Sequence, residues 1–133
     1  MPILRAYDPE AICLQLGADA HYLDPLAHLN LTAQGWLDIV RDVKSLGKPI
    51  VALGGGGYNG TTVPRMWTLA FSLLFGVPLA DETPSDFAHH DIIPTLTDRE
   101  KPEIPAAYDK LSHHEALHAV EQLKMLLFPR FGL

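Results

Sequence analysis

Two short apolar segments, each ended by glycine, constrain the fold of this chain most strongly. Residues 11–16 and 49–53 are largely apolar and stop at Gly17 and Gly54. Such runs are typical of parallel strands that are covered on both faces. We therefore expect Cys13, the single cysteine, to be a buried apolar side chain in the first strand rather than a reactive thiol.

A helical pattern follows each of these segments. Thr32 is placed to N-cap a helix over about 33–46, and Thr61 or Thr62 is placed to begin another that ends before Gly76. The order strand, helix, strand, helix predicts parallel strands joined by a right-handed crossover. The expected fold class is therefore α/β, with a parallel-sheet β-α-β-α unit.

The charge distribution divides the 133 residues into three parts. Residues 1–80 hold the α/β unit and are nearly neutral, whereas 81–109 hold eight acidic and two basic side chains and account for the net charge of −6. The second part also contains four of the prolines, which predicts an acidic, extended, solvated segment. Residues 110–133 are expected to form a carboxyl-terminal helix.

Composition excludes several classes of protein. The acidic balance argues against a nucleic-acid binder with a basic surface, and one cysteine excludes a disulfide framework. No apolar run approaches the roughly 20 residues that cross a bilayer, and the start of the chain lacks a signal-sequence pattern. We expect a soluble cytoplasmic protein without nucleic-acid or membrane partners.

The loop over residues 17–31 follows the first predicted strand and is unusually long. Ligands bind beyond the carboxyl ends of parallel strands, so this loop is a candidate site. Asp24, which precedes proline, is either a turn initiator or a carboxylate ligand for a divalent metal. In the second case, His21 or His28 is a candidate further ligand. Spacing alone does not choose between these interpretations.

The loop over residues 54–60 follows the second predicted strand and carries four consecutive glycines. It matches a dinucleotide-binding pattern, but no later strand ends in the required acidic residue, and no P-loop lysine is present. A glycine run also lets a narrow substrate pass close to the main chain. Tyr58 would then place a hydroxyl where it can donate to an oxyanion; the alternative is a turn tyrosine packed on a neighbour.

A third motif lies in the predicted carboxyl-terminal helix. His114, Glu115 and His118 form a literal H-E-x-x-H, which can hold zinc beside a general base. The motif needs a third ligand, and Glu121 is the only conventional one that follows. We expect the match to be coincidental and the helix to pack by one face through Leu111, Leu117, Val120, Leu123 and Leu127.

Together, the segments 14–21, 24–26, 30–32, 54–59 and 64–68 resemble the carboxyl-terminal part of the histone deacetylase superfamily. The resemblance is greatest to the bacterial acetoin utilization proteins and covers about residues 3–87. It implies part of an arginase-like α/β fold with a central parallel sheet, an active-site zinc, and hydrolysis of an acyl amide such as acetyl-lysine.

The resemblance also assigns individual residues. Asp24 corresponds to a zinc-binding aspartate and Tyr58 to the tyrosine that polarises the acyl carbonyl. Gly56, with its neighbour Gly55, corresponds to a glycine of the narrow acyl channel, and Leu31 corresponds to an apolar wall residue of that channel.

Much of the family's site has no counterpart in this chain. The paired catalytic histidines and the Asp-x-His ligands lie upstream of the matched region in the family, whereas His89–His90 and His113–His114 follow Tyr58. We therefore expect a carboxyl-terminal fragment of a zinc-dependent deacylase that is inactive alone. Its expected partners are the missing amino-terminal part, an acetyl-lysine protein or acylated small molecule, and further copies of itself. The alternatives are a noncatalytic interaction module or half of a split protein, and, third, an H-E-x-x-H metallopeptidase.

Overall fold

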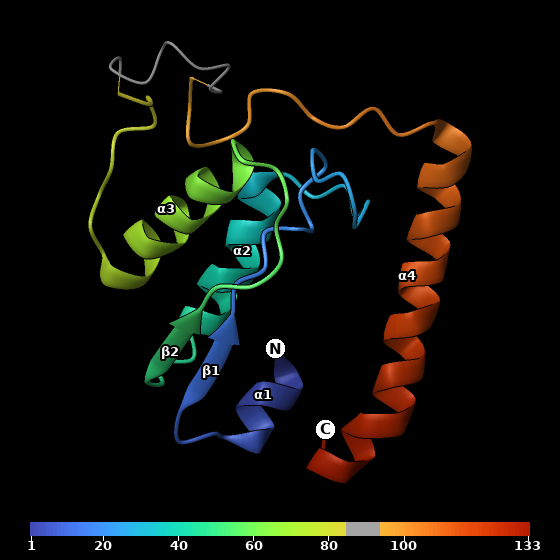
Figure 1. Cartoon of the computed structure of the whole chain (residues 1–133). Coiled ribbons are helices and arrows are strands. Elements are labelled where there is room, and N and C mark those ends of the chain that lie inside the picture. The colour runs from blue at the N-terminus through green and yellow to red at the C-terminus, as the bar shows by residue number, and fades with distance from the viewer. Residues whose placement is uncertain (85–93) are drawn as a thin grey trace. The chain divides into compact units, whose positions relative to one another are not determined.

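The computed structural model describes residues 1–84 and 94–133. Figure 1 shows the elements, which in chain order are α1 (Pro2–Tyr7), β1 (Ile12–Gln15), α2 (Ala33–Lys44), β2 (Ile50–Leu53), α3 (Thr62–Phe75), α4 (Ala106–Leu127) and the 3-10 helix η2 (Phe128–Phe131). Internal contacts divide the chain into two units, one of residues 11–102 and one of residues 1–10 with 103–133. Each unit is described by itself below.

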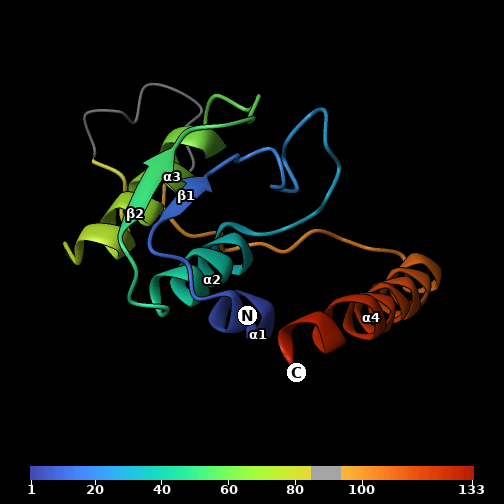
Figure 2. The same cartoon turned by 90° about the horizontal axis from the view of Figure 1, so that it is seen from below.

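The two predicted strands form a parallel pair in the larger unit. Ile12 lies opposite Ile50, and Gln15 lies opposite Leu53. The arrows of β1 and β2 point the same way in Figure 1 and lie side by side again in Figure 2. The ladder continues past the strand, because the Leu16 N–H donates to the Leu53 carbonyl at 2.8 Å. This confirms the predicted α/β class with parallel strands.

Helix α2 begins where the sequence predicts. The Thr32 side chain accepts a hydrogen bond from the Gly35 N–H at 3.1 Å, which satisfies one of the free donors at the helix start. The helix ends at Lys44, and Gly47 follows with a φ of 69°, a conformation that suits glycine.

Helix α3 begins at Thr62, with Thr61 in the N-cap position, as predicted, but an earlier side chain supplies the capping hydrogen bonds. Thr61 makes no side-chain cap hydrogen bond. Instead, the Asn59 side-chain oxygen accepts from the N–H groups of Thr61 at 3.0 Å and Thr62 at 3.1 Å. Asparagine is at least as good a capping residue as threonine, and here it lies two residues before Thr61, directly after Tyr58. The helix ends at Gly76, as predicted.

A single buried cluster holds the larger unit together. Trp36 and Val40 of α2 and Met66 and Ala70 of α3 pack with Leu16 at the end of β1. Leu14 of β1 lies against this cluster, so the two helices cover one face of the sheet.

The other face of the sheet is exposed, contrary to the prediction. Cys13, which was expected to be buried, is exposed, and so are Gln15, Val51 and Leu53. Because side chains alternate along a strand, all four point away from the helix-covered face. The apolar composition predicted cover on both faces, but the structure provides it on one.

The two tryptophans bind the backbone at one point. The indole N–H of Trp67 donates to the Leu16 carbonyl at 2.8 Å, and that of Trp36 donates to the Gly17 carbonyl at 2.9 Å. These carbonyls lie where the chain leaves β1, so helices α2 and α3 both fix the start of the loop over 17–31.

The smaller unit consists of α1, which was not predicted, α4 and η2. Helix α4 begins at Ala106 rather than near residue 110. Its predicted packing face is largely open, since Leu111, Leu117 and Leu123 are all more than half exposed. The row of apolar residues that predicted a buried face of α4 is therefore mostly exposed in the structure.

The acidic segment over 81–109 makes more contacts than predicted. Residues 85–93 lie outside the described residues. On either side of them, Glu82 and Thr95 form an antiparallel bridge, and Thr95 and Asp98 are buried. The residues on both sides of 85–93 are therefore anchored in the larger unit.

Among the helices in the described part of the chain, none combines the length and apolar character that crossing a membrane requires. The cytoplasmic location stays a prediction.

Candidate functional site

The loops over 17–31 and 54–60, both predicted as candidate sites, are joined to each other. The Ala18 N–H donates to the Gly56 carbonyl at 2.6 Å, and the Tyr58 N–H donates to Oδ2 of Asp24 at 2.9 Å. The carboxyl ends of β1 and β2 therefore bring Asp24 and Tyr58 to one site, as the topology predicted.

Asp24 is 3% exposed and is held by backbone donors. Its Oδ1 accepts from the N–H groups of Leu26 at 2.9 Å and Ala27 at 3.1 Å, which is the turn that an Asp-Pro sequence favours. Burial raises the pKa of this carboxyl, but the hydrogen bonds from Leu26, Tyr58 and Ala27 outweigh burial and lower the pKa below its ordinary value of 3.8. Asp24 is therefore an oriented anion near neutral pH.

Tyr58 combines a fixed backbone with an open side chain. Its N–H is bound to Asp24, whereas the residue is 61% exposed. The alternative of a turn tyrosine packed on a neighbour does not describe this arrangement.

The glycines have a local packing reason. A Cβ at Gly55 would lie 2.5 Å from the Gln15 side chain, and one at Gly56 would overlap the Asp19 carboxylate. At Gly55 a Cβ would also lie 2.8 Å from the Gly17 Cα, so the close approach of the two backbones requires glycine there, whereas the Asp19 side chain can move away from a Cβ at Gly56. The predicted contact of Gly55 and Gly56 with substrate stays a prediction.

Leu31 lies at the end of the first loop. It forms a parallel bridge with His21, and its side chain packs partly buried against the core cluster. Its role as a wall of an acyl channel stays a prediction.

His21, a candidate metal ligand in the sequence, is fully buried and both of its ring nitrogens are engaged. Nδ1 accepts from the Leu23 N–H at 3.1 Å, and Nε2 lies 2.9 Å from Oδ2 of Asp98. The interpretation of His21 as a metal ligand does not fit this geometry, because neither nitrogen is left to bind an ion.

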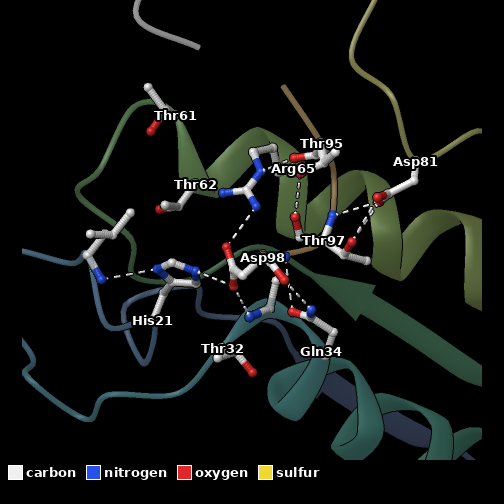
Figure 3. A network of polar contacts seen from close by, with 12 residues as sticks. His21, Thr32, Gln34, Thr61, Thr62, Arg65, Asp81, Thr95, Thr97 and Asp98 are labelled. Carbon is white, nitrogen blue, oxygen red and sulfur yellow. Dashed lines mark hydrogen bonds and ion pairs between the residues drawn. The ribbon is translucent and has the colours of Figure 1, made fainter. Parts of the chain in front are cut away.

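The partner of His21 is a residue that sequence analysis missed. The Asp98 carboxylate accepts from the Ala33 N–H at 2.6 Å and forms an ion pair with Arg65 at 2.8 Å. Figure 3 shows Asp98 at the centre of this network, with His21 and Arg65 pointing to it from different elements. The segment that contains Asp98 was predicted to be solvated, and no sequence pattern around Asp98 signals that its side chain is buried.

Burial and hydrogen bonding oppose each other at Asp98. Burial raises the pKa of its carboxyl. The hydrogen bonds from the Ala33 N–H, Arg65 and His21 outweigh burial, so the pKa lies below its ordinary value of 3.8. The network is therefore built around an ionised carboxylate.

The residues present do not make a complete metal site. Over residues 1–84 and 94–133, no three His, Cys, Asp or Glu side chains gather where they could hold a metal ion. A catalytic zinc normally takes three protein ligands. Asp24 has the charge and fixed orientation of one such ligand, but the described residues do not supply a full set.

The H-E-x-x-H motif belongs to the other unit. His114 and Glu115 form an ion pair whose two side chains are exposed, and His118 lies 3.5 Å from Gln122 on the same exposed helix. Nothing in these contacts builds a zinc site.

The larger unit thus brings a buried carboxylate and the backbone of an exposed tyrosine together beyond the ends of two adjacent parallel strands. Residues 1–74, more than half of the chain, match the histone deacetylase domain family. The chain belongs to the histone deacetylase domain family.

Curated relatives agree with this assignment. A putative histone deacetylase 2 of Caenorhabditis elegans is 34% identical over 114 residues, which cover 78% of this chain and 22% of that protein. Type-1 histone deacetylase 1 of Dictyostelium discoideum is 41% identical over 87 residues, 62% of this chain and 18% of that protein. Histone deacetylase 9 of Arabidopsis thaliana is 37% identical over 84 residues, which cover 63% of this chain and 20% of that protein.

The chain thus spans about a fifth of the length of these relatives. It corresponds to a part of histone deacetylase-like proteins. The acetoin utilization branch stays a prediction.

Proposed function

We propose that this chain is the carboxyl-terminal segment of a zinc-dependent deacylase that hydrolyses acetyl-lysine or a similar acyl amide, and that it is inactive alone. The observation that carries the proposal is the contact between Tyr58 and Asp24, at 2.9 Å, on two loops at the ends of parallel strands. It supports a shared site for two residues whose roles the family resemblance suggests.

In this proposal Asp24 is one metal ligand. Its carboxylate is ionised, and three backbone N–H groups fix its direction. When bound in a completed site, zinc would polarise the acyl carbonyl and lower the pKa of a bound water towards about 7. The other ligands and the acid–base histidines come from a complementary polypeptide.

Tyr58 is the proposed oxyanion donor. The residue is largely exposed and its backbone N–H is bound to Asp24, so in this proposal the hydroxyl donates to a carbonyl oxygen bound near that carboxylate. A single donor of this kind typically contributes about 100-fold to 1000-fold in rate. The proposed substrate is an acetyl-lysine protein or an acylated small molecule.

The surface along β2 supports a complementary polypeptide. Within the described residues, β2 pairs only with β1. A cavity of about 260 Å³ lies between β2 and α3, and its lining includes Ala52 of β2 and the side chains of Phe71 and Phe75, which are both more than half exposed. A free strand edge beside an apolar groove favours association with another chain. We propose that this partner is the amino-terminal part of the deacylase.

The same surface favours a second candidate, a noncatalytic interaction module or half of a split protein. In that case the groove would bind its partner, but the assembled pair would not hydrolyse acyl amides. Activity of the assembly therefore separates the two candidates.

The test is a chimera in which this full chain replaces the aligned segment of a histone deacetylase relative. We expect the chimera to release acetate from an acetyl-lysine peptide in the presence of Zn²⁺, and the chain alone to release none. A folded chimera that binds zinc without activity would favour the noncatalytic module. Activity of the pure chain would contradict the requirement for a partner.

A further inference from the structure

The Asp98 carboxylate gathers three donors from three segments of the chain. Oδ2 accepts from the Ala33 N–H at 2.6 Å and from His21 Nε2 at 2.9 Å, and Oδ1 accepts from Arg65 Nη2 at 2.8 Å. The side chains of Asp98, His21 and Arg65 are at most 4% exposed. The ionic contacts are therefore shielded from water and strong.

The backbone of Asp98 is held as firmly as its side chain. The Gln34 amide donates to the Asp98 carbonyl at 2.7 Å, and the Asp98 N–H donates to the Gln34 side-chain oxygen at 3.1 Å. This two-way contact is drawn below Asp98 in Figure 3. It attaches the carboxylate to the first turn of α2.

The His21 side of the network leads to Asp24. Because Nδ1 accepts the Leu23 N–H, the ring proton lies on Nε2 and is donated to Asp98. The His21 carbonyl accepts the Asp24 N–H at 2.9 Å. Asp98 therefore fixes the ring of the residue that begins the turn carrying Asp24.

The Arg65 side of the network leads to Tyr58. Arg65 lies in the first turn of α3, whose start is capped by Asn59, the residue after Tyr58. Arg65 Nε also donates to the Thr95 carbonyl at 2.7 Å. One carboxylate is thus connected, through different partners, to both loops of the candidate site.

We infer that Asp98 is a positioning residue, which holds the loops of Asp24 and Tyr58 in register with each other. The inference rests on the proposed function for what the two loops do, but the coupling itself is a property of this chain. Among the described residues, the Asp98 carboxylate bonds to His21, Arg65 and Ala33 and not to Asp24 or Tyr58, so it acts on the two loops through its partners.

Asparagine cannot replace this carboxylate. With its single oxygen toward His21 and Ala33, its NH₂ group would face the Arg65 guanidinium; with the oxygen toward Arg65, the NH₂ would face two other donors. Asp98→Asn therefore keeps the size of the side chain and breaks one side of the network.

The test is amide hydrogen exchange of the ¹⁵N-labelled full chain, read residue by residue. In Asp98→Asn, we expect the amides of Asp24 and Tyr58 to exchange roughly tenfold faster, while those of Ile12 and Leu16 in the strand ladder keep their rates. The ¹⁵N shifts of the His21 ring should also lose the pattern of a protonated Nε2 and a free Nδ1.

Two other variants complete the test. Asp81→Asn is the matched control, because Asp81 binds Thr97 in the same segment without touching His21 or Arg65; it should leave the Tyr58 amide unchanged. Gln34→Ala keeps every buried charge, so it covers the case in which Asp98→Asn fails to fold. It should accelerate the Asp24 and Tyr58 amides by a smaller factor.

Two outcomes would overturn the inference. Faster exchange at every amide would mean general destabilisation, and faster exchange at Ala33 alone would mean only the loss of its own hydrogen bond to Asp98. The readout does not use activity. An inactive chimera with the expected exchange pattern would support the coupling and refute the proposed function. An active chimera without that pattern would support the proposed function and refute the coupling.

Discussion

The backbone N–H of Tyr58 donates to Oδ2 of Asp24 at 2.9 Å across 34 positions of sequence. This bond joins the ends of two parallel strands, and it leaves the Tyr58 side chain exposed while Asp24 is buried. Substitution of the two residues should therefore have different effects. Changing Tyr58 should alter the rate of the reaction, whereas changing Asp24 should alter the order of the loop and the binding of metal.

Tyr58→Phe should lower turnover of the chimera without reducing its zinc content. The variant removes only the hydroxyl that we assign to the oxyanion, so a loss of about 100-fold to 1000-fold is expected. Tyr22→Phe is the matched control, because Tyr22 lies in the neighbouring loop, stacked on His21, and has no assigned catalytic role. Unchanged turnover in Tyr58→Phe would remove the assignment.

Asp24→Ala should reduce the zinc content of the chimera and loosen the loop. It removes the acceptor of three backbone N–H groups as well as the proposed ligand. Metal analysis and the exchange rate of the Tyr58 amide measure the two effects separately. Asp38→Ala, at an exposed carboxylate that pairs with Arg41, should change neither.

Gly56→Ala should destabilise the chain by about 1 kcal/mol, the low end for an overpacked methyl group, because its Cβ would displace the Asp19 carboxylate, which ends a side chain that can move. Gly60→Ala is the control, since a Cβ there meets nothing within 4 Å. Urea denaturation gives both values. Combining Gly56→Ala with Asp19→Ala should recover part of the loss, and no recovery would place the strain elsewhere.

The stability of the chain should fall on acidification partly through Asp98. The pKa of this carboxyl is lowered in the folded state, so its contribution is complete above the unfolded value of about 3.9 and is lost as pH falls through the folded pKa. Thermal unfolding between about pH 5 and 3 should therefore show a steeper loss of Tm in the wild type than in Asp98→Asn. Equal slopes would count against an ionised, paired Asp98.

Phe75→Asp should reduce self-association of the isolated chain. Phe75 is 71% exposed and lines the groove beside β2, where a charge opposes apolar contact. Sedimentation velocity should show oligomers for the wild type and a shift toward monomer for the variant. Leu117→Asp, on the exposed helix α4, is the control; a wild type that is strictly monomeric would contradict the expectation.

The sequence predicted those parts of the fold that depend on neighbouring residues. The strands, the Thr32 cap and the glycine that ends α3 follow from patterns a few positions long. Parallel topology then placed Asp24 and Tyr58 at one site. Helix α3 begins at Thr62 as predicted, and the structure adds that the Asn59 side chain makes the capping hydrogen bonds.

What the sequence did not predict depends on distant contacts. The bond between His21 and Asp98 spans 77 positions, and no periodicity marks a partner so far away. The acidic composition around Asp98 predicted solvation, yet one of its carboxylates is buried by pairing. The exposure of Cys13 was missed for a related reason: apolar composition shows that a strand can be covered, not that this chain supplies the cover.

The positions of the two tryptophans make the chain its own optical probe. Both indoles are bonded to consecutive carbonyls at the start of the first loop, and the sequence contains no other tryptophan. Intrinsic fluorescence will therefore report on the root of that loop, so that partner docking or local melting there can be followed without an added label.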